Sequence, residues 1–204
     1  MTDAYRFDES STEQAIAYAK IYGENYSPAM ETVLKVAFSE KRNLPTFRLK
    51  SSDTILLSGY MKKWVGAYLA GYNNRPSVRT GNCSGTHPDP MAKTILRARI
   101  SGLEDNLADK IVARHSLLMT IENNIGELLE EYLSVKLSPL GWYCCWGSTI
   151  DAVDFCKADG SLLQIKTSDN SENSSSSRVR QGTPIGKWFR RFSRRPGVYN
   201  WESF

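Results

Sequence analysis

The chain has 204 residues and a formal net charge of +4, with 41% hydrophobic and 24% charged residues. This composition excludes an intrinsically disordered chain, and no apolar run approaches the roughly 20 residues of a membrane-spanning helix. The length suits one sizeable domain. The polar N-terminus predicts no secretory signal, and the cysteines match neither a zinc ribbon nor a disulfide framework. We therefore expect idle thiols and a cytoplasmic protein; the cysteines are Cys83, Cys144, Cys145 and Cys156.

Residues 1–110 are expected to form a mainly helical N-terminal region. We expect this region to provide packing surface. Apolar residues recur at helical spacing over 11–38, with a break near 25–28, and again over 51–72. A long loop rich in Asn, Gly, Pro and Ser follows over 73–91 and contains Arg75 and Arg79.

A second helical stretch over 92–137 is predicted to split into two helices near 101–106. The second of these is long and ends before Ser138 and Pro139, since proline cannot continue a helix. The period then changes to that of strands over 142–146, 150–156 and 162–167. This order of helices followed by a strand meander indicates an α/β (α+β) fold.

The C-terminal segment is polar and then basic. After a run of Ser and Asn over 168–177, Thr183 and Pro184 predict the start of a short helix that carries Lys187, Arg190 and Arg191. Residues 171–204 contain seven basic and two acidic residues, which is typical of a surface that binds a polyanion. A basic face that only contacts solvent is the alternative interpretation.

The segment 153–166 holds the strongest chemical pattern. Asp154 lies on a short apolar run, Asp159 and Gly160 mark a turn, and a second apolar run carries Gln164 and Lys166. Residues two apart on a strand share a face, so Gln164 and Lys166 project together and the turn brings Asp154 beside them. A divalent ion held by oxygen ligands can neutralise a phosphodiester and activate water, and a lysine can orient that water. The segment therefore predicts a hydrolytic site that uses magnesium.

This pattern resembles the PD-(D/E)XK nuclease signature, with valine before Asp154 in place of proline and Gln164 where Asp or Glu is usual. Nucleases of this class often carry a further acidic residue on the preceding helix, where Glu127, Glu130 and Glu131 are available. We select Glu127, although a solvated helix charge is the alternative for each. The candidate metal ligands are Asp154, Gln164 and Glu127, and Lys166 completes the candidate catalytic set. Because an amide oxygen is neutral, either Glu127 supplies the missing charge or the ion binds loosely until DNA arrives.

A longer resemblance covers residues 149–201. The strand Leu-Leu-Gln-Ile-Lys is followed there by the Ser/Asn run, then by Arg-Val-Arg-Gln-Gly-Thr-Pro-Ile and Lys-Trp-Phe-Arg. This stretch is similar to the SinI family of type II restriction endonucleases. The resemblance implies a restriction-endonuclease-like core, a central mixed sheet flanked by helices over 111–204, joined to the helical region formed by residues 1–110. That helical region is a candidate for DNA or dimer contacts. It implies magnesium-dependent cleavage of double-stranded DNA at a short palindrome of the type GGWCC, where W is A or T.

The same resemblance implies partners. A homodimer matches the two-fold symmetry of a palindrome, and a DNA methyltransferase that protects the same site is the expected genetic partner. Arginine can pair with guanine and asparagine with adenine, so the candidate base or backbone contacts are Asn170, Asn173, Arg178 and Arg180. The candidate phosphate contacts are Lys187, Arg190 and Arg191. Two alternatives stay open: a repair or structure-selective nuclease of the same fold, and a non-catalytic DNA-binding module in which Gln164 marks a decayed site.

Overall fold

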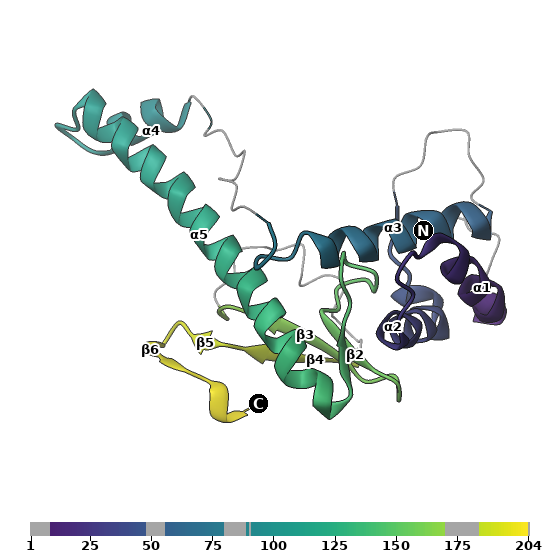
Figure 1. The fold of residues 1–204 in the computed structure, drawn as a ribbon. Helices are drawn as coiled ribbons and strands as arrows, with labels where there is room; N and C mark the ends of the chain where they lie inside the picture. The colour runs from purple at the N-terminus through teal and green to yellow at the C-terminus, as the bar shows by residue number, and fades with distance from the viewer. Residues whose placement is uncertain (1–8, 48–55, 80–88, 90, 170–183, 204) are drawn as a thin grey trace.

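A computed structural model describes residues 9–47, 56–79, 89, 91–169 and 184–203. Within these residues, helices occupy the N-terminal two thirds and a small sheet follows (Figure 1). The α-helices are α1 (Thr12–Tyr22), α2 (Pro28–Ser39), α3 (Leu57–Asn73), α4 (Met91–Arg99) and α5 (Asp105–Leu137). Short 3-10 turns lie at Glu9–Ser11, Lys41–Asn43, Ser138–Leu140 and Trp201–Ser203.

The helices confirm the predictions made from the spacing of apolar residues in the sequence. The predicted break near 25–28 separates α1 from α2, because Pro28 begins α2 and the Ser27 hydroxyl accepts a hydrogen bond from the Met30 amide at 3.2 Å. The predicted split near 101–106 separates α4 from α5. Residues 51–55, the expected start of the third helix, lie outside the described residues.

The strands form the expected mixed sheet in the order β1-β2-β3-β4. Their bounds are β1 (Trp142–Cys144), β2 (Phe155–Lys157), β3 (Leu162–Lys166) and β4 (Ile185–Phe189). The first three strands form the predicted antiparallel meander, although the second is shorter than expected. Strand β4 pairs with β3 in parallel, with Gln164 opposite Lys187 and Lys166 opposite Phe189. A separate antiparallel ribbon contains β5 (Arg191–Phe192) and β6 (Arg195–Tyr199).

The helix predicted after Thr183 and Pro184 is wrong, because Ile185–Phe189 is strand β4. The local capping signal suggested a helix, but pairing with β3 decides the conformation. Trp188 packs its ring into the core, and its indole N–H donates to the Asn200 carbonyl at 3.2 Å. Lys187 therefore extends from a strand and not from a helix.

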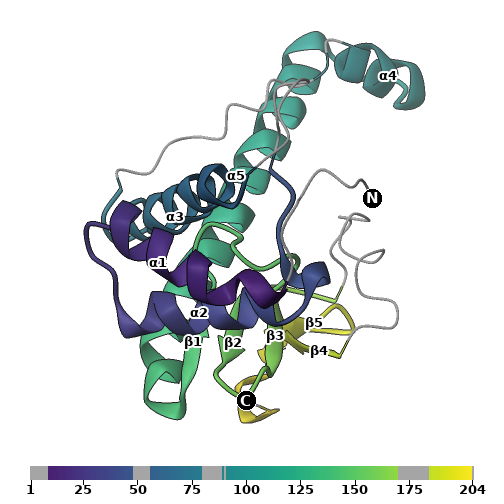
Figure 2. The same cartoon turned by 90° about the vertical axis from the view of Figure 1, so that its right-hand side faces the viewer.

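The sheet is covered on both faces (Figure 2). The first core cluster joins α1, α2 and α3 to the sheet side through Cys145, Val153 and Cys156. A second cluster places the C-terminal half of α5 on the other face; its buried members are Leu129, Leu133, Leu137, Cys144, Phe155, Ile165 and Trp188. The expected division after residue 110 falls inside α5, and the N-terminal helices share their core with the sheet.

Helix α3 fixes the loop between β1 and β2. The Trp64 indole N–H donates to the Thr149 carbonyl at 2.9 Å, and both groups are buried. Gly71 and Gly147 meet so closely that a methyl group on either would overlap the backbone opposite. Gly147 also has φ +70, a left-handed conformation that favours glycine. The loop that borders the candidate site is therefore held by backbone contact with α3.

The N-terminal half of α5 projects from the body, with α4 packed beside it (Figure 1). Lys93 binds Asp109 at 2.8 Å and Asp105 at 3.5 Å, and Arg97 binds Asp105 at 2.6 Å. These ion pairs tie α4 to one side of α5. Among the helices of the described residues, none combines the length and apolar character needed to cross a membrane.

Candidate active site

Asp154 lies directly before β2 and is held by backbone contacts to both neighbouring strands. Its amide donates to the Leu163 carbonyl at 3.0 Å, and its carbonyl accepts from the Cys145 amide at 2.9 Å. The carboxylate oxygen Oδ2 accepts from the Ile165 amide at 2.7 Å. The hairpin thus fixes the orientation of this carboxylate against β3.

Strand β3 supplies Gln164 and Lys166. Leu163 and Ile165 pack toward α5, whereas Leu162 packs toward the N-terminal helices, so the strand alternates as expected. The Gln164 side chain is buried, and its Oε1 has no hydrogen-bond partner within the described residues. Lys166 ends the strand, and its carbonyl accepts from the Arg190 amide at 2.8 Å.

Glu130 on α5 is the third residue near this hairpin. Burial raises the pKa of its carboxyl to about 8; the negative charge of Asp154 acts in the same direction, and the positive charge of Lys166 opposes it. The charges of Asp154 and Lys166 thus act on this carboxyl, although its burial is the larger effect. Helix α5 and the segment before β2 bring Glu130 and Asp154 to one place.

A cavity of about 120 Å³ opens at this place. Its walls are Glu130, Asp154, Val153 and the segment from Cys144 to Ser148. Burial raises the pKa of the Cys144 thiol, and the carboxylates Glu130 and Asp154 raise it further. Cys144 is therefore a neutral thiol, and Glu130 and Asp154 are the acidic groups of the cavity wall; with a pKa of about 8, Glu130 is largely protonated near neutral pH when no cation is bound.

The neighbouring acidic residues of α5 have other partners. Glu127 forms an ion pair with Arg79. Glu131 binds Arg75 at 3.3 Å and accepts from the Ser77 amide at 2.9 Å. The structure thus places Glu130, one of the three glutamates considered from the sequence, beside Asp154, and engages our selected Glu127 with the segment after α3.

The donor set fits a magnesium ion. No cluster of three or more His, Cys, Asp or Glu side chains with metal-binding geometry occurs in the described part of the chain. Magnesium needs only one or two carboxylates when water and substrate phosphate complete its shell. The Asp154 and Glu130 carboxylates, which line one cavity, meet that need. The Gln164 oxygen has no partner among the described residues, but Gln164 is not part of the cavity wall.

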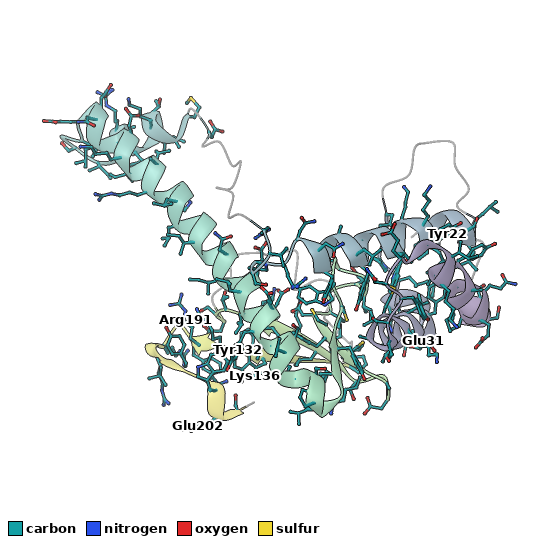
Figure 3. All side chains as sticks on the ribbon, in the orientation of Figure 1. Tyr22, Glu31, Tyr132, Lys136, Arg191 and Glu202 are labelled. Atoms are coloured by element: carbon teal, nitrogen blue, oxygen red, sulfur yellow. The ribbon has the colours of Figure 1, made fainter. Side chains whose placement is uncertain are left out.

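The C-terminal segment lies next to Lys166. Lys187 is exposed on β4, whereas Arg190 and Arg191 are half-buried, and Arg190 stacks over the Tyr199 ring at 5.1 Å. Figure 3 shows Arg191 on the side of α5 that carries Tyr132 and Lys136. The other candidate DNA contacts lie outside the described residues; these are Asn170, Asn173, Arg178 and Arg180.

The sequence did not reveal two contacts around the site. Asp169, three residues after Lys166, accepts from the Ser193 amide at 2.6 Å and from its hydroxyl at 3.2 Å. This contact joins the end of β3 to the β5–β6 ribbon, and no local pattern signals it. The second is the docking of Arg75 and Arg79 onto α5, for which the only signal was two arginines in a loop.

Comparisons with known proteins extend over the whole chain. The model of the SinI restriction endonuclease family matches residues 52–204. The type II restriction enzyme SinI of Salmonella infantis is 46% identical over 210 residues, which cover 100% of this chain and 89% of that enzyme. The type II restriction enzyme Eco47I of Escherichia coli is 44% identical over 124 residues, covering 58% of this chain and 53% of that enzyme. The similarity therefore includes the N-terminal helices.

Proposed function

Because the chain belongs to the SinI family of type II restriction endonucleases, we propose that it cleaves double-stranded DNA at a GGWCC-like palindrome with magnesium as cofactor. The family makes it a sequence-specific endonuclease; the target and the ion are our additions. The observation that carries the proposal is that Glu130 and Asp154 line one cavity, with the Lys166 charge close enough to act on the Glu130 carboxyl. We assign the three metal ligands as Asp154, Glu130 and Gln164, with Glu130 in the place for which the sequence suggested Glu127.

The carboxylates have distinct tasks. The Ile165 amide fixes one oxygen of Asp154, so the carboxylate keeps a single orientation toward the cavity. Glu130 is held close to a like charge, which is unfavourable unless a cation lies nearby. Magnesium, when bound, supplies charge neutralisation at the phosphate and a more acidic water. The arrangement of Asp154 and Glu130 thus favours a divalent cation at the scissile phosphate.

Lys166 acts on the reacting groups. Its ammonium can orient the attacking water and offset the charge that develops on the phosphate oxygens. Its position is set by pairing of β3 with β4 and by the Arg190 amide on its carbonyl. The backbone that carries this ammonium is thus already in place when DNA binds.

DNA binding is assigned to the basic C-terminal segment. Lys187, Arg190 and Arg191 are the proposed phosphate contacts, which position the duplex without reading its sequence. The proposed base readers remain Asn170, Asn173, Arg178 and Arg180, whose side chains suit a G·C and A·T target. These four residues follow β3 in the sequence, and β3 also carries Lys166, which supports the assignment.

The proposal includes a homodimer and a cytoplasmic setting. A palindrome cut on both strands is matched by two copies related by a two-fold axis. The free thiols Cys144, Cys145 and Cys156 suit a reducing compartment. A methyltransferase that modifies the same palindrome is the proposed genetic partner.

Lys166→Ala tests the chemistry. In a plasmid digest with magnesium, we expect cleavage to fall by about 100-fold or more, because the ammonium at the phosphate is lost. Binding of a GGWCC duplex in calcium should change little. Lys157→Ala, on the neighbouring strand, is the matched control and should cut normally. Undiminished cleavage by Lys166→Ala would disprove the assignment, and nicks confined to lesions in place of discrete fragments would indicate a repair nuclease.

Glu130→Gln and Glu127→Gln decide which glutamate is the second carboxylate ligand beside Asp154. We expect Glu130→Gln to lose cleavage and to bind magnesium more weakly, since a charged ligand becomes neutral. Glu127→Gln should retain cleavage, because its carboxylate serves the ion pair with Arg79. The reverse result would restore the assignment suggested by the sequence.

A further inference from the structure

Helix α5 carries a second apolar face besides the one packed on the sheet. We call it the open face of α5; its residues between 107 and 128 are Leu107, Ile111, Arg114, Leu118, Ile121, Ile125 and Leu128. Leu107, Leu118, Ile121 and Leu128 remain 45–53% exposed in the folded chain. Soluble proteins rarely leave a continuous apolar surface of this extent uncovered unless something binds there.

The spacing along the open face is that of a coiled coil. Its residues alternate in steps of three and four, so Ile111, Leu118 and Ile125 form one row of the heptad and Leu107, Ile121 and Leu128 lie on the other. The pattern continues for one more heptad in Tyr132 and Val135. A repeat of 3.5 residues kept over four heptads indicates a helix that packs along another helix of similar length.

The described elements of the chain leave this face uncovered over its projecting half. Helix α4 is tied by ion pairs to Asp105 and Asp109, which lie on the opposite side of α5 from the open face. The described C-terminal segment meets the face at Tyr132, near the C-terminal end of α5; the Tyr132 ring lies 6.2 Å from the Trp201 ring in an edge arrangement. Figure 3 shows Tyr132 on the side of α5 toward the C-terminal strands. In the projecting half of α5, the described elements therefore contact the side opposite the open face, and the open face is accessible to a binding partner.

We infer that the open face of α5 is covered by α5 of a second copy, and that this contact forms the homodimer. A stable interface buries roughly 800 Å² per partner, and the open face runs about 32 Å along α5 from Leu107 to Leu128, at about 1.5 Å per residue. A two-fold axis pairs a surface with itself, and a heptad row is complementary to an identical row. This inference deepens the proposed function by locating its dimer contact.

The chemistry of the face argues against DNA as the occupant. DNA binding needs several cations along the backbone, whereas Arg114 is the only charged residue among the seven of the open face. A single charged residue in an otherwise apolar heptad row fixes register and lowers dimer stability. Arg114 therefore has the position expected of a register-setting residue in a pair of identical helices.

Sedimentation equilibrium of the full chain, without DNA or magnesium, tests the inference. We expect a wild-type dimer, and Leu118→Glu should raise its dissociation constant by at least about 100-fold, because a charge is then buried in the seam. Ile21→Glu is the matched control: Ile21 is 73% exposed on α1, away from α5, and its replacement should leave the dimer unchanged. Circular dichroism checks that α5 stays helical in each variant.

Arg114→Leu should change the dimer dissociation constant in the opposite direction, a result that misfolding cannot produce. Removing the charge from the seam should tighten the dimer by at least about fivefold. A monomeric wild type, equal dissociation of Leu118→Glu and Ile21→Glu, or weaker association of Arg114→Leu would each overturn the inference. Since no step depends on cleavage, these outcomes are separate from the Lys166→Ala digest that tests the nuclease.

Discussion

Replacing Glu130 by glutamine should stabilise the metal-free protein while abolishing its activity. In the wild type, the Glu130 carboxyl lies partly buried beside Asp154 and its pKa is raised to about 8. Glutamine keeps the shape and the hydrogen-bonding capacity but carries no charge at any pH. The variant therefore isolates the cost of ionising a carboxyl that is buried and lies beside Asp154.

The sign and size of the effect follow from the pKa. Unfolding returns this carboxyl from about 8 to its ordinary pKa of 4.5. A carboxyl whose pKa is raised by folding contributes a stability that is complete below the lower value and is lost as pH rises through the higher one. The shift corresponds to at most about 5 kcal/mol. Because the cavity opens to solvent and Lys166 offsets part of the repulsion, we expect about 2 kcal/mol.

Urea unfolding in EDTA, followed by the fluorescence of the five tryptophans, measures this difference. At about pH 5 the two proteins should unfold alike, and above about pH 8 Glu130→Gln should be more stable. Glu131→Gln is the control; it removes a carboxylate bound to Arg75, so it should destabilise or have no effect. Adding calcium should stabilise the wild type more than Glu130→Gln. A stability difference that does not change with pH, or a less stable Glu130→Gln above pH 8, would refute the reasoning.

Two further predictions concern the supports of the site. Gly71→Ala should destabilise the fold by about 2 kcal/mol or more, because its methyl group overlaps the Gly147 backbone; Gly59→Ala in the same helix meets nothing and should be neutral or slightly stabilising in a thermal melt. Asp169→Ala should raise amide hydrogen exchange in β5 and β6 without affecting α1 to α3, because the two hydrogen bonds from Ser193 are lost. Unchanged exchange there would show that the ribbon is held by other contacts.

Local signals in the sequence were sufficient for most of the fold. Helix periods, the Ser27 and Pro28 start of α2, and the turn at Gly160 depend on residues a few positions apart, and each appears where it was expected. Strand β4 depends on a partner about twenty residues away in the sequence. The capping signal at Thr183 and Pro184 could not report that pairing, so the segment was predicted as a helix.

The choice of the glutamate ligand shows a different limit of the sequence. Helix α5 has two apolar faces, one through Leu129 and Leu133 and one through Leu128 and Tyr132. Periodicity alone cannot tell which of them packs on the sheet, and that choice decides which glutamate points toward β3. Asp154, Gln164 and Lys166 were easier to place, because a short hairpin fixes their relation within the sequence itself.

The parallel pairing of β3 with β4 has a consequence for how such enzymes diversify. The chain leaves the sheet after Lys166 and returns to the adjacent strand at Ile185, so the stretch with the proposed base readers spans two anchored ends. The free-energy cost of closing a chain between fixed ends grows slowly, by only about 0.6 kcal/mol for each doubling of length. Insertions, deletions and substitutions there can accumulate while Asp154 and Lys166 keep their geometry. New target sequences can thus evolve separately from the chemistry that cuts them.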